Sequence, residues 1–338
     1  MSISGNALIM REVNLNLIRR ALKTYKQATK QQLAEYTGLS IVTIGTLLQT
    51  LLDEHIAIEV GFVPSSGGRP AQQFEFNADH GHVMALFTHE QNGADILHIR
   101  VANLYGQCVY SDDAELSEIT LNTFEGWIDP LIETYPTLRA IGFGLPGVAY
   151  DGKIILSDYQ HLSGTDFLAH YSERYGLPTL FANDVNAASI GYCKRNQIES
   201  ETTVLYLYFP KKYPPGLGIC INGSLYKGKH NFAGEIAHVP SGVNWWDTQL
   251  YETPEKLHNA LSQLIMTLSG VLAPHIIAIY ASFLTAEHIQ LLQNVCAEHL
   301  PQAQVPEIRH TRDFIVDYQN GVIEETLVLL EPKLAISL

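Results

Sequence analysis

The segment TLFANDVNAA, residues 179–188, decides the class of fold, because a strand-like apolar run gives way to a helix-like run at a polar Asn183–Asp184 pair. Open α/β sheets bind ligands at the carboxyl ends of their strands, which is where such a pair would lie. Asp184 could there accept a hydrogen bond from a ligand hydroxyl or act as a general base. The pair could equally serve only as the N-cap of the helix.

Strand-like and helix-like runs alternate on both sides of this segment. The strand-like runs lie at 83–87, 96–104, 140–145, 203–209 and 218–221, and the helix-like runs lie at 121–135 and 257–272. Interleaving of this kind over ~250 residues predicts an α/β body with two lobes. We assign residues 77–338 to this body, with one lobe at about 77–184 plus the C-terminal helix and the other at about 185–315.

Two further motifs follow the Asn183–Asp184 pair. In PGLGICING, residues 215–223, the close glycines would let backbone N–H groups approach a phosphate, or Asn222–Gly223 would form the turn of a plain β-hairpin. In AGEIAH, residues 233–238, Glu235 and His238 stand three apart, so one helical turn would place both on the same side. That pair suits a hydroxyl-bearing ligand, although such pairs also occur for purely structural reasons.

Residues 1–76 have a different pattern, which begins with a helix. Val13, Leu17, Ala21 and Leu22 predict the buried face of a helix over 13–25. Thr29 can cap a short helix, Gly38 ends it, and Ser40 can cap a second helix over 40–52. The apolar residues of this second helix recur at helical spacing, at Ile44, Leu47, Leu48, Leu51 and Leu52.

A β-hairpin is predicted next. Alternating residues at 56–63 and 71–76 flank the Gly-rich segment PSSGGRP, residues 64–70. Two short helices joined by a glycine turn and followed by such a hairpin predict a winged helix-turn-helix, which binds DNA.

The predicted DNA contacts come from the second helix and the hairpin tip. Ser40, Thr43, Thr46 and Gln49 would face the major groove, and Arg69 would reach the minor groove or the backbone. The helix offers no Arg or Lys, so the commonest contact to guanine is missing. The alternative is a small helical domain that binds another protein.

The charge is unevenly distributed along the 338 residues. The net charge is −14, but residues 1–50 hold six basic and two acidic side chains, which gives +4 there and −18 for the rest. A small basic end on an acidic body predicts that only the first part touches a polyanion.

The cysteines and the apolar runs restrict the setting of the chain. The four cysteines have no C-x-x-C spacing, and no apolar run approaches the ~18–20 residues of a membrane span. The first 20 residues lack the pattern of a secretion signal. We therefore expect a cytoplasmic protein that has no membrane partner, bound cofactor or metal.

Taken together, these motifs resemble the ROK family (repressors, open reading frames and sugar kinases). The resemblance rests on LAEYTGLS at 33–40 and GGRP at 67–70, then GLPG at 144–147, NDVNAA at 183–188, GLGICINGSLYKG at 216–228 and AGEIAH at 233–238. It implies an actin-like (ribonuclease H-like) two-lobed sugar-kinase fold. Members with an N-terminal winged helix are transcriptional repressors whose DNA binding responds to a sugar or a partner.

The resemblance also implies roles for individual residues. Asn183 and Asp184 would hold sugar hydroxyls, and Asp184 matches the catalytic base of kinase members. Glu235 and His238 match a second pair of sugar contacts. Additional matches are Gly147 beside the sugar, Gly216 and Gly218 in a phosphate loop, and an acidic sugar contact at Glu252 or Glu255.

Three stretches depart from the family pattern. Kinase members have Asp-x-Gly-Gly-Thr, which cradles ATP phosphates, where this chain has LFTHEQNG at 86–93, and their late glycines are replaced around 279–282. Members usually carry a zinc-binding cysteine cluster after the histidine, but residues 239–255 contain no cysteine, so a four-ligand zinc site is not expected. Trp245 and Trp246 in that stretch could provide core packing or a stacking surface for a sugar.

These patterns favour a sugar-responsive regulator, of the repressor type, without catalytic activity. Its partners would be palindromic operator DNA, a sugar or sugar phosphate, and further copies of itself in a homodimer or homotetramer. One alternative is an ATP-dependent sugar kinase with an added DNA-binding domain. A second is a DNA-binding or scaffold protein that senses no ligand, suggested by the altered 239–256 region and by Ala237 in place of the family's usual glycine.

Overall fold

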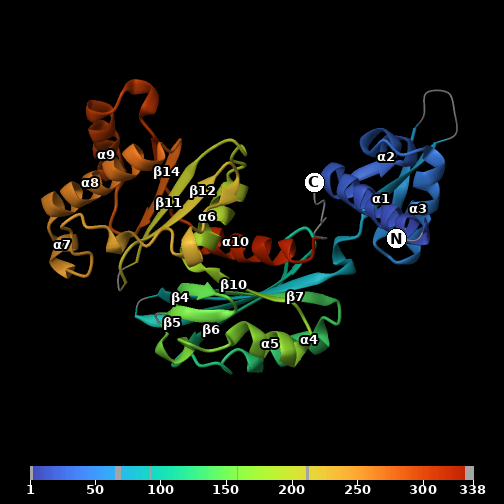
Figure 1. The fold of residues 1–338 in the computed structure, drawn as a ribbon, viewed down its shortest axis with the longest axis horizontal. Helices are drawn as coiled ribbons and strands as arrows, with labels where there is room; N and C mark the ends of the chain where they lie inside the picture. The colour runs from blue at the N-terminus through green and yellow to red at the C-terminus, as the bar shows by residue number, and fades with distance from the viewer. Residues whose placement is uncertain (1–2, 65–69, 92, 158, 211–212, 332–338) are drawn as a thin grey trace. The chain divides into compact units, whose positions relative to one another are not determined.

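The computed structural model describes residues 3–64, 70–91, 93–157, 159–210 and 213–331 (Figure 1). The chain forms two compact units. The N-terminal unit comprises Met1–His82 with Asn103–Gln107, and the body comprises Val83–Ala102 with Cys108–Leu338. The domain boundary at residue 76 and the division into lobes remain predictions.

The N-terminal unit combines helices with a small sheet. Its elements are α1 (Ile3–Tyr25), β1 (Gln27–Thr29), α2 (Lys30–Thr37), α3 (Ile41–Asp53), β2 (Ala57–Val63), β3 (Ala71–Phe76) and the 3-10 turn η1 (Ala78–His80). The sheet has the order β1-β3-β2, and β3 is antiparallel to both neighbours. Its tip, residues 65–69, lies outside the described residues.

The predicted caps of α2 and α3 are confirmed. The Thr29 hydroxyl accepts a hydrogen bond from the Gln32 N–H at 3.2 Å, and the Thr29 N–H donates to the Gln32 side chain at 2.9 Å. Gly38 ends α2 in the left-handed conformation, with φ 72°. Ser40 then caps α3 by accepting from the Thr43 N–H. Two short helices therefore meet at a tight turn fixed by local chemistry.

The predicted buried face of α1 is wrong in part. Ala21 and Leu22 are buried as expected, but Leu17 is 38% exposed and Val13 is only half-buried. Leu15 and Ile18 are buried instead and join the apolar cluster of the unit. Two apolar rows on α1 share Ala21 and Leu22, so helical spacing could not choose between them, and packing within the unit did.

The body contains two five-stranded sheets. The first has the order β10-β7-β4-β5-β6, and the second has the order β13-β12-β11-β14-β15. Numbered within its own sheet, each reads 5-4-1-2-3 or its reverse. The strands are β4 (His82–Gln91), β5 (Ala94–Asn103), β6 (Cys108–Leu116), β7 (Leu138–Leu145), β10 (Thr179–Asn183), β11 (Val204–Phe209), β12 (Gly216–Ile221), β13 (Ser224–Leu225), β14 (Ile276–Ala281) and β15 (Glu307–His310).

Helices cover both faces of these sheets, which confirms the predicted α/β class (Figure 1). The helices are α4 (Glu125–Thr134), α5 (Phe167–Tyr175), α6 (Asp184–Arg195), α7 (Thr248–Glu252), α8 (Pro254–Leu272), α9 (Ala286–His299) and α10 (Phe314–Val328). Shorter elements are the hairpin β8 (Gly147–Tyr150) and β9 (Lys153–Ser157) and the 3-10 turns η2 (Gln160–Leu162), η3 (Lys229–Asn231), η4 (Ile236–His238) and η5 (Gln302–Gln304). No described helix has the length and apolar character to cross a membrane.

Alternation along the strands separates the body into apolar layers. On β4, Met84 and Leu86 pack with residues of α4 and α5, whereas Val83, Ala85 and Phe87 pack with residues of α6 and α10. The strands of the second sheet also contribute to the layer around α6 and α10, and their opposite faces pack with α8 and α9. One layer containing α6 and α10 therefore joins the two sheets.

The crossing of α6 and α10 requires glycine on both helices. A Cβ on Gly191 of α6 would lie 1.8 Å from the carbonyl oxygen of Asp317. A Cβ on Gly321 of α10 would lie 1.8 Å from the carbonyl oxygen of Ala187. Backbone atoms cannot rotate away as a side chain can, so any larger residue would push the helices apart.

We expect Gly191→Ala to lower the free energy of unfolding of the body by more than about 2 kcal/mol, because overpacking here meets backbone. Gly270→Ala is the matched control, since Gly270 lies in helix α8 and a Cβ added there would have nothing within 4 Å of it. That control should gain roughly 0.5–1 kcal/mol. Urea unfolding followed by tryptophan fluorescence reports the body alone, because Trp127, Trp245 and Trp246 all lie in it. Equal stability of the two variants would contradict the expectation.

Candidate functional site

A cavity of about 120 Å³ lies at the carboxyl ends of strands β4, β7, β10 and β11. Asn183, at the end of β10, pairs in register with Leu145, at the end of the parallel strand β7. The described residues that line the cavity are His89, Glu90, Asp95, Pro146, Gly147, Tyr159, Asn183, Asp184, Val185, Asn186, Tyr208, Pro210, Tyr213, Pro214, Pro215, Gly216, Leu217, Asn231, Ala233, Gly234 and Glu235. This is the sheet edge at which α/β folds bind ligands.

Asn183 has a structural function at the cavity wall. Its Oδ1 accepts a hydrogen bond from the Asn186 N–H at 3.0 Å, which makes it the N-cap of α6. Its Nδ2 donates to the carbonyl oxygen of Gly147 at 3.0 Å. The helix-cap interpretation thus holds for Asn183, and the side chain also ties the loop at Gly147 to α6.

Asp184 occupies the first turn of α6 and is half-buried in the cavity lining. The unsatisfied N–H groups of a helix N-terminus favour a negative charge at this position. Tyr208 lies close enough for Asp184 to affect it: burial raises the pKa of Tyr208 well above its usual value, and the charge of Asp184 adds to the shift. Asp184 therefore brings a carboxylate into the lining of the cavity.

Glu235 reaches the cavity from the opposite sheet, but His238 does not. Glu235 precedes the 3-10 turn η4 and is half-buried in the lining. The loop before it is held against β12, since the Leu217 N–H donates to the carbonyl oxygen of Gly234 at 3.1 Å. His238 is exposed beside the Phe232 ring, with 5.7 Å between ring centroids, and is outside the cavity lining.

Of the other predicted ligand contacts, some line the cavity and others lie outside it. Gly147 and Gly216 line the cavity. Glu252 and Glu255 are exposed and lie outside the lining. Trp245 is 2% exposed and belongs to the core, whereas Trp246 is 59% exposed.

The glycine-rich segment 215–223 forms a hairpin rather than a loop. Residues Gly216–Ile221 are strand β12, which pairs with the short strand β13. The connecting residues Asn222 and Gly223 both have positive φ, 51° and 71°, as a type I′ turn requires. Gly218 lets α6 approach the sheet closely, because its Cβ would lie 2.6 Å from Cβ of Ser189.

The described lining is rich in carboxylates. Four of them, Glu90, Asp95, Asp184 and Glu235, line the cavity, and no Lys or Arg is among the described lining residues. The neighbouring Lys211 and Lys212 lie outside the described part of the chain. Carboxylates accept hydrogen bonds from hydroxyl groups, so the described lining suits a ligand rich in such donors. Nowhere in the described residues does a group of three or more His, Cys, Asp or Glu side chains come together to hold a metal ion.

Part of the body is similar to a known protein family. Residues 92–249 match the profile of the ROK family. The chain carries a ROK family domain. The matched residues supply most of the cavity lining.

Named proteins similar to this chain include repressors. It is 26% identical over 253 residues to the "Xylose repressor" of Bacillus subtilis, a match that covers 72% of this chain and 64% of that protein. It is 21% identical over 247 residues to the "DNA-binding transcriptional dual regulator NagC" of Escherichia coli K12, covering 70% of this chain and 59% of NagC. The chain thus spans less than two thirds of the length of these relatives.

Solved structures show the fold of the body. A ROK family transcriptional regulator described as a homolog of the E. coli MLC protein superposes with a TM-score of 0.70 at 15% identity, covering 95% of this chain and 99% of that one. A ROK hexokinase from Thermus thermophilus superposes with a TM-score of 0.59 at 14% identity, covering 74% and 99%. The body therefore has the actin-like α/β fold of the ROK sugar kinases.

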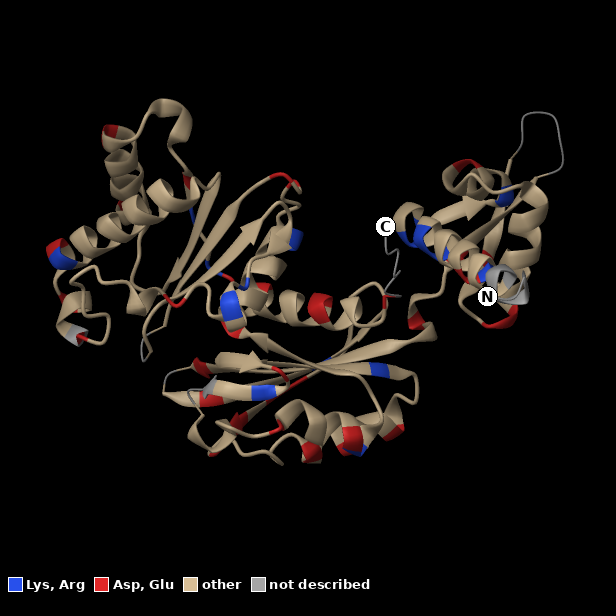
Figure 2. Cartoon of the chain, in the orientation of Figure 1, with Lys and Arg blue, Asp and Glu red and all other residues tan. Residues whose placement is uncertain are grey.

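The N-terminal unit presents polar side chains along α3. Ser40, Thr46 and Gln49 are exposed, and Thr43 is half-buried. Ser40 is used as the helix cap, and the Gln49 amide donates to Asp53 at 2.8 Å. Arg69, the predicted contact from the hairpin tip, lies outside the described residues. Most Lys and Arg of the unit lie on α1 (Figure 2).

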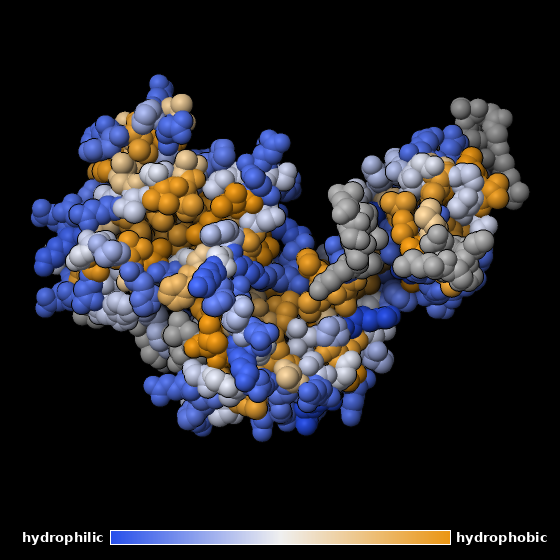
Figure 3. All heavy atoms as spheres, viewed as in Figure 1, coloured by the Kyte–Doolittle hydropathy of each residue, from blue (hydrophilic) through white to orange (hydrophobic). Residues whose placement is uncertain are grey.

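The sequence patterns missed several residues that line the cavity or the exposed face of α3. His89 and Glu90 lie near the end of strand β4 at the cavity. The signal that indicated Asn183, polar residues directly after a strand-like apolar run, is present there too. Ile41 and Val42 are 56% and 80% exposed at the start of α3, and apolar side chains reach the surface of this unit (Figure 3). Exposed apolar residues beside an amphipathic pattern are the signal that could have found them.

His89 makes the stability of the body depend on pH. Burial lowers the pKa of His89 from 6.5 to about 4, and His98 adds to the shift. The unfolded chain therefore takes up this proton first as the pH falls, so the stabilisation is complete above about pH 6.5 and is lost between about 6.5 and 4.

We expect the wild-type chain to lose roughly 1–2 kcal/mol more unfolding free energy than His89→Asn between pH 7.5 and 4.5, in urea titrations followed by tryptophan fluorescence. His299→Asn, which removes an exposed histidine of the body, should behave like the wild type. Identical pH dependence of His89→Asn and wild type would contradict the expectation.

Proposed function

We propose that this chain is a sugar-responsive transcriptional regulator, a repressor, which binds operator DNA through its N-terminal unit and a sugar in the cavity of its body. The observation that carries the proposal is that α2 and α3, joined by a tight turn and followed by a hairpin, precede a body with a ROK family match and a cavity lined by Asp184 and Glu235. The names of relatives from B. subtilis and E. coli support it.

The N-terminal unit would act as a winged helix-turn-helix. Supporting features are the element order α1-β1-α2-α3-β2-β3, the tight turn from Gly38 to Ser40, and the antiparallel hairpin of β2 with β3. Helix α3 would enter the major groove. Thr46 and Gln49 would meet base edges there, and Ile41 and Val42 would contact thymine methyl groups.

Electrostatic attraction to DNA would be modest. Residues 1–50 carry only +4, and the rest of the chain carries −18, which repels phosphates. Specific binding would therefore rely on two copies of the chain reading a palindromic operator, so that two-fold protein symmetry fixes the half-site spacing. Few phosphate contacts per copy also imply a small dependence on salt.

The cavity would hold the effector. Asp184 follows β10 of the first sheet, and Glu235 lies in the segment after β12 and β13 of the second, so a sugar bound to both would link the two halves of the body. Such a ligand changes DNA binding only if it binds one arrangement of the halves better than the other.

The body would bind its ligand without transferring phosphate. Where kinase relatives have a phosphate-cradling Asp-x-Gly-Gly-Thr, this chain continues strand β4 with Thr88, His89 and Glu90. Phosphoryl transfer depends on positioning and charge neutralisation of the phosphates, which a carboxylate at this place opposes. The presence of Asp184 at the base position favours the alternative of a sugar kinase, and an assay separates the two.

DNA binding is tested first by footprinting the full chain on its own upstream region at low salt, with and without sugars. We expect protection of a palindromic site. Thr46→Ala and Gln49→Ala should each weaken binding to that site roughly five- to hundredfold, as lost base contacts do.

Thr24→Ala is the matched control, because Thr24 is an exposed threonine on helix α1 of the same unit and should leave the affinity unchanged. Absence of any footprint under all these conditions would reject the proposed function.

Catalysis is tested by coupled ADP release with ATP and a panel of common hexoses and amino sugars. We expect no turnover above background. A turnover that disappears in Asp184→Ala would establish the kinase alternative and overturn the proposal.

A further inference from the structure

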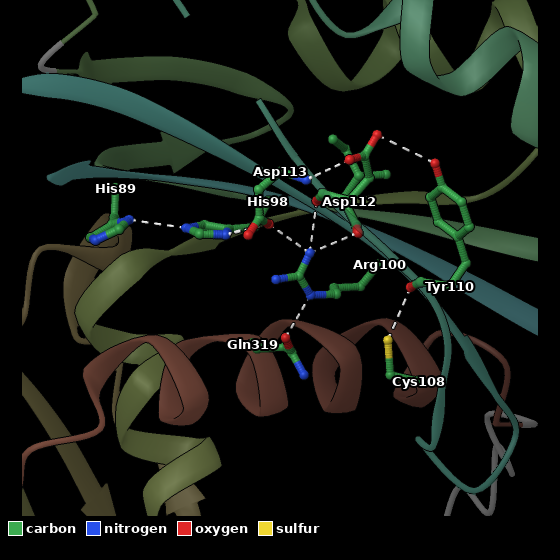
Figure 4. A network of polar contacts seen from close by, with 9 residues as sticks. His89, His98, Arg100, Cys108, Tyr110, Asp112, Asp113 and Gln319 are labelled. Atoms are coloured by element: carbon green, nitrogen blue, oxygen red, sulfur yellow. Dashed lines mark hydrogen bonds and ion pairs between the residues drawn. The ribbon is translucent and has the colours of Figure 1, made fainter. Parts of the chain in front are cut away.

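A chain of hydrogen bonds runs from the cavity to the edge strand of the first sheet (Figure 4). His89, in the cavity lining, has its Nδ1 3.1 Å from Nε2 of His98 on β5. Nδ1 of His98 lies 2.8 Å from Oδ1 of Asp113 on β6. Figure 4 also shows the second ring nitrogen of His89 turned away from His98.

The carboxylate of Asp113 determines which ring nitrogen of His98 and of His89 carries a proton. Burial by itself would raise the pKa of Asp113, but hydrogen bonds from Arg100 and His98 lower it, so the group is ionised and only accepts. His98 must then donate through Nδ1, which leaves its Nε2 without a proton when the ring is neutral. His89 must donate to that nitrogen through its own Nδ1, so its Nε2 is unprotonated and can accept a hydrogen bond.

Both imidazoles are neutral near pH 7. Burial lowers the pKa of His98, against the opposite effect of Asp113. Burial is also the main cause that lowers the pKa of His89 to about 4. Neither ring then carries the extra proton that would reverse the direction of the hydrogen bonds.

The packing around the chain holds the rings in place. Arg100 is 7% exposed and donates to Oδ1 of Asp113 at 2.8 Å, to Gln319 of α10 at 2.7 Å and to the carbonyl oxygens of Ile99 and Asp112. The Phe87 ring stacks on His98 with 4.8 Å between centroids. The direction of the hydrogen bonds is therefore built into the sheet and is not set by solvent.

We propose that His89 is a ligand-recognition residue of the cavity, whose Nε2 lone pair accepts a hydrogen bond from a hydroxyl of a neutral polyol, and that His98 and Asp113 are positioning residues that fix this tautomer. The inference rests on the proposed function, because it needs a ligand in the cavity. The inference adds to that function the kind of ligand group recognised beside His89, a hydroxyl of a neutral polyol.

The same geometry disfavours a phosphate at this end. Phosphate oxygens are acceptors and find no donor in a bare imidazole nitrogen. Glu90 and Asp95 line the cavity beside His89 and add negative charge. Within the described lining, His89, Glu90 and Asp95 each offer an acceptor to a hydroxyl donor, so a neutral sugar is favoured over its phosphate ester.

The tautomer can be measured without any ligand. Long-range ¹H–¹⁵N spectra of the full chain with labelled histidine, at pH 7.5, should show His89 protonated at Nδ1 and bare at Nε2, with the signal assigned by its absence in His89→Phe. Asp113→Ala should shift this signal towards a mixture of tautomers. Asp112→Ala, on the same strand but with its carboxylate hydrogen-bonded to Tyr110 and the Asp113 N–H rather than to His98, should leave it unchanged. A protonated Nε2 on wild-type His89 overturns the assignment.

Ligand recognition is tested by calorimetric titration with D-glucose, D-xylose and glucose 6-phosphate. We expect a neutral sugar to bind wild type more tightly than glucose 6-phosphate. His89→Phe should weaken that sugar roughly three- to tenfold, which is the effect of one lost hydrogen bond. His89→Asn, which keeps an acceptor, should recover part of the affinity.

Two contrary results have different meanings. If a neutral sugar binds wild type and His89→Phe equally well, or glucose 6-phosphate binds wild type more tightly, the role of His89 is rejected while the sugar site stands. If none of the three binds wild type, the sugar-binding part of the proposed function fails and this inference fails with it.

Discussion

The close crossing of α6 and α10 is the constraint on which the body depends. Gly191 and Gly321 each bring backbone against backbone, at a separation that leaves no room for a Cβ. The layer that contains these helices packs on both five-stranded sheets, so their spacing sets the spacing of the sheets. Asp184 begins α6, so its position in the cavity lining depends on the contact that the same helix makes with α10.

The cavity combines this rigid frame with acceptor chemistry. Asn183 uses one hydrogen bond from each of its polar atoms to fix the start of α6 and the loop at Gly147. Asp184 and Glu235 approach from different sheets, and His89 approaches from the end of β4. A site that bridges two packed halves is suited to coupling a bound ligand to a change in their arrangement, which is what a regulator needs.

Local chemistry explains why part of the structure could be predicted from the sequence. Thr29, Gly38 and Ser40 act through neighbours three or four residues away, so their caps were evident before any fold was known. The strand-to-helix transition at Asn183 was predictable for the same reason. The buried face of α1 was not, because Leu15 and Leu17 lie on two apolar rows that helical spacing cannot rank.

The sequence by itself determined the α/β class, the caps of α2 and α3 and the position of Asp184 at the start of a helix, because each depends on residues close in the chain. Only the tertiary structure decided that Glu235 enters the cavity while His238 stays outside, and that His89, His98 and Asp113 form one hydrogen-bonded chain. Those arrangements join separate strands and loops, and their contacts depend on strand register and packing, which short-range patterns do not encode.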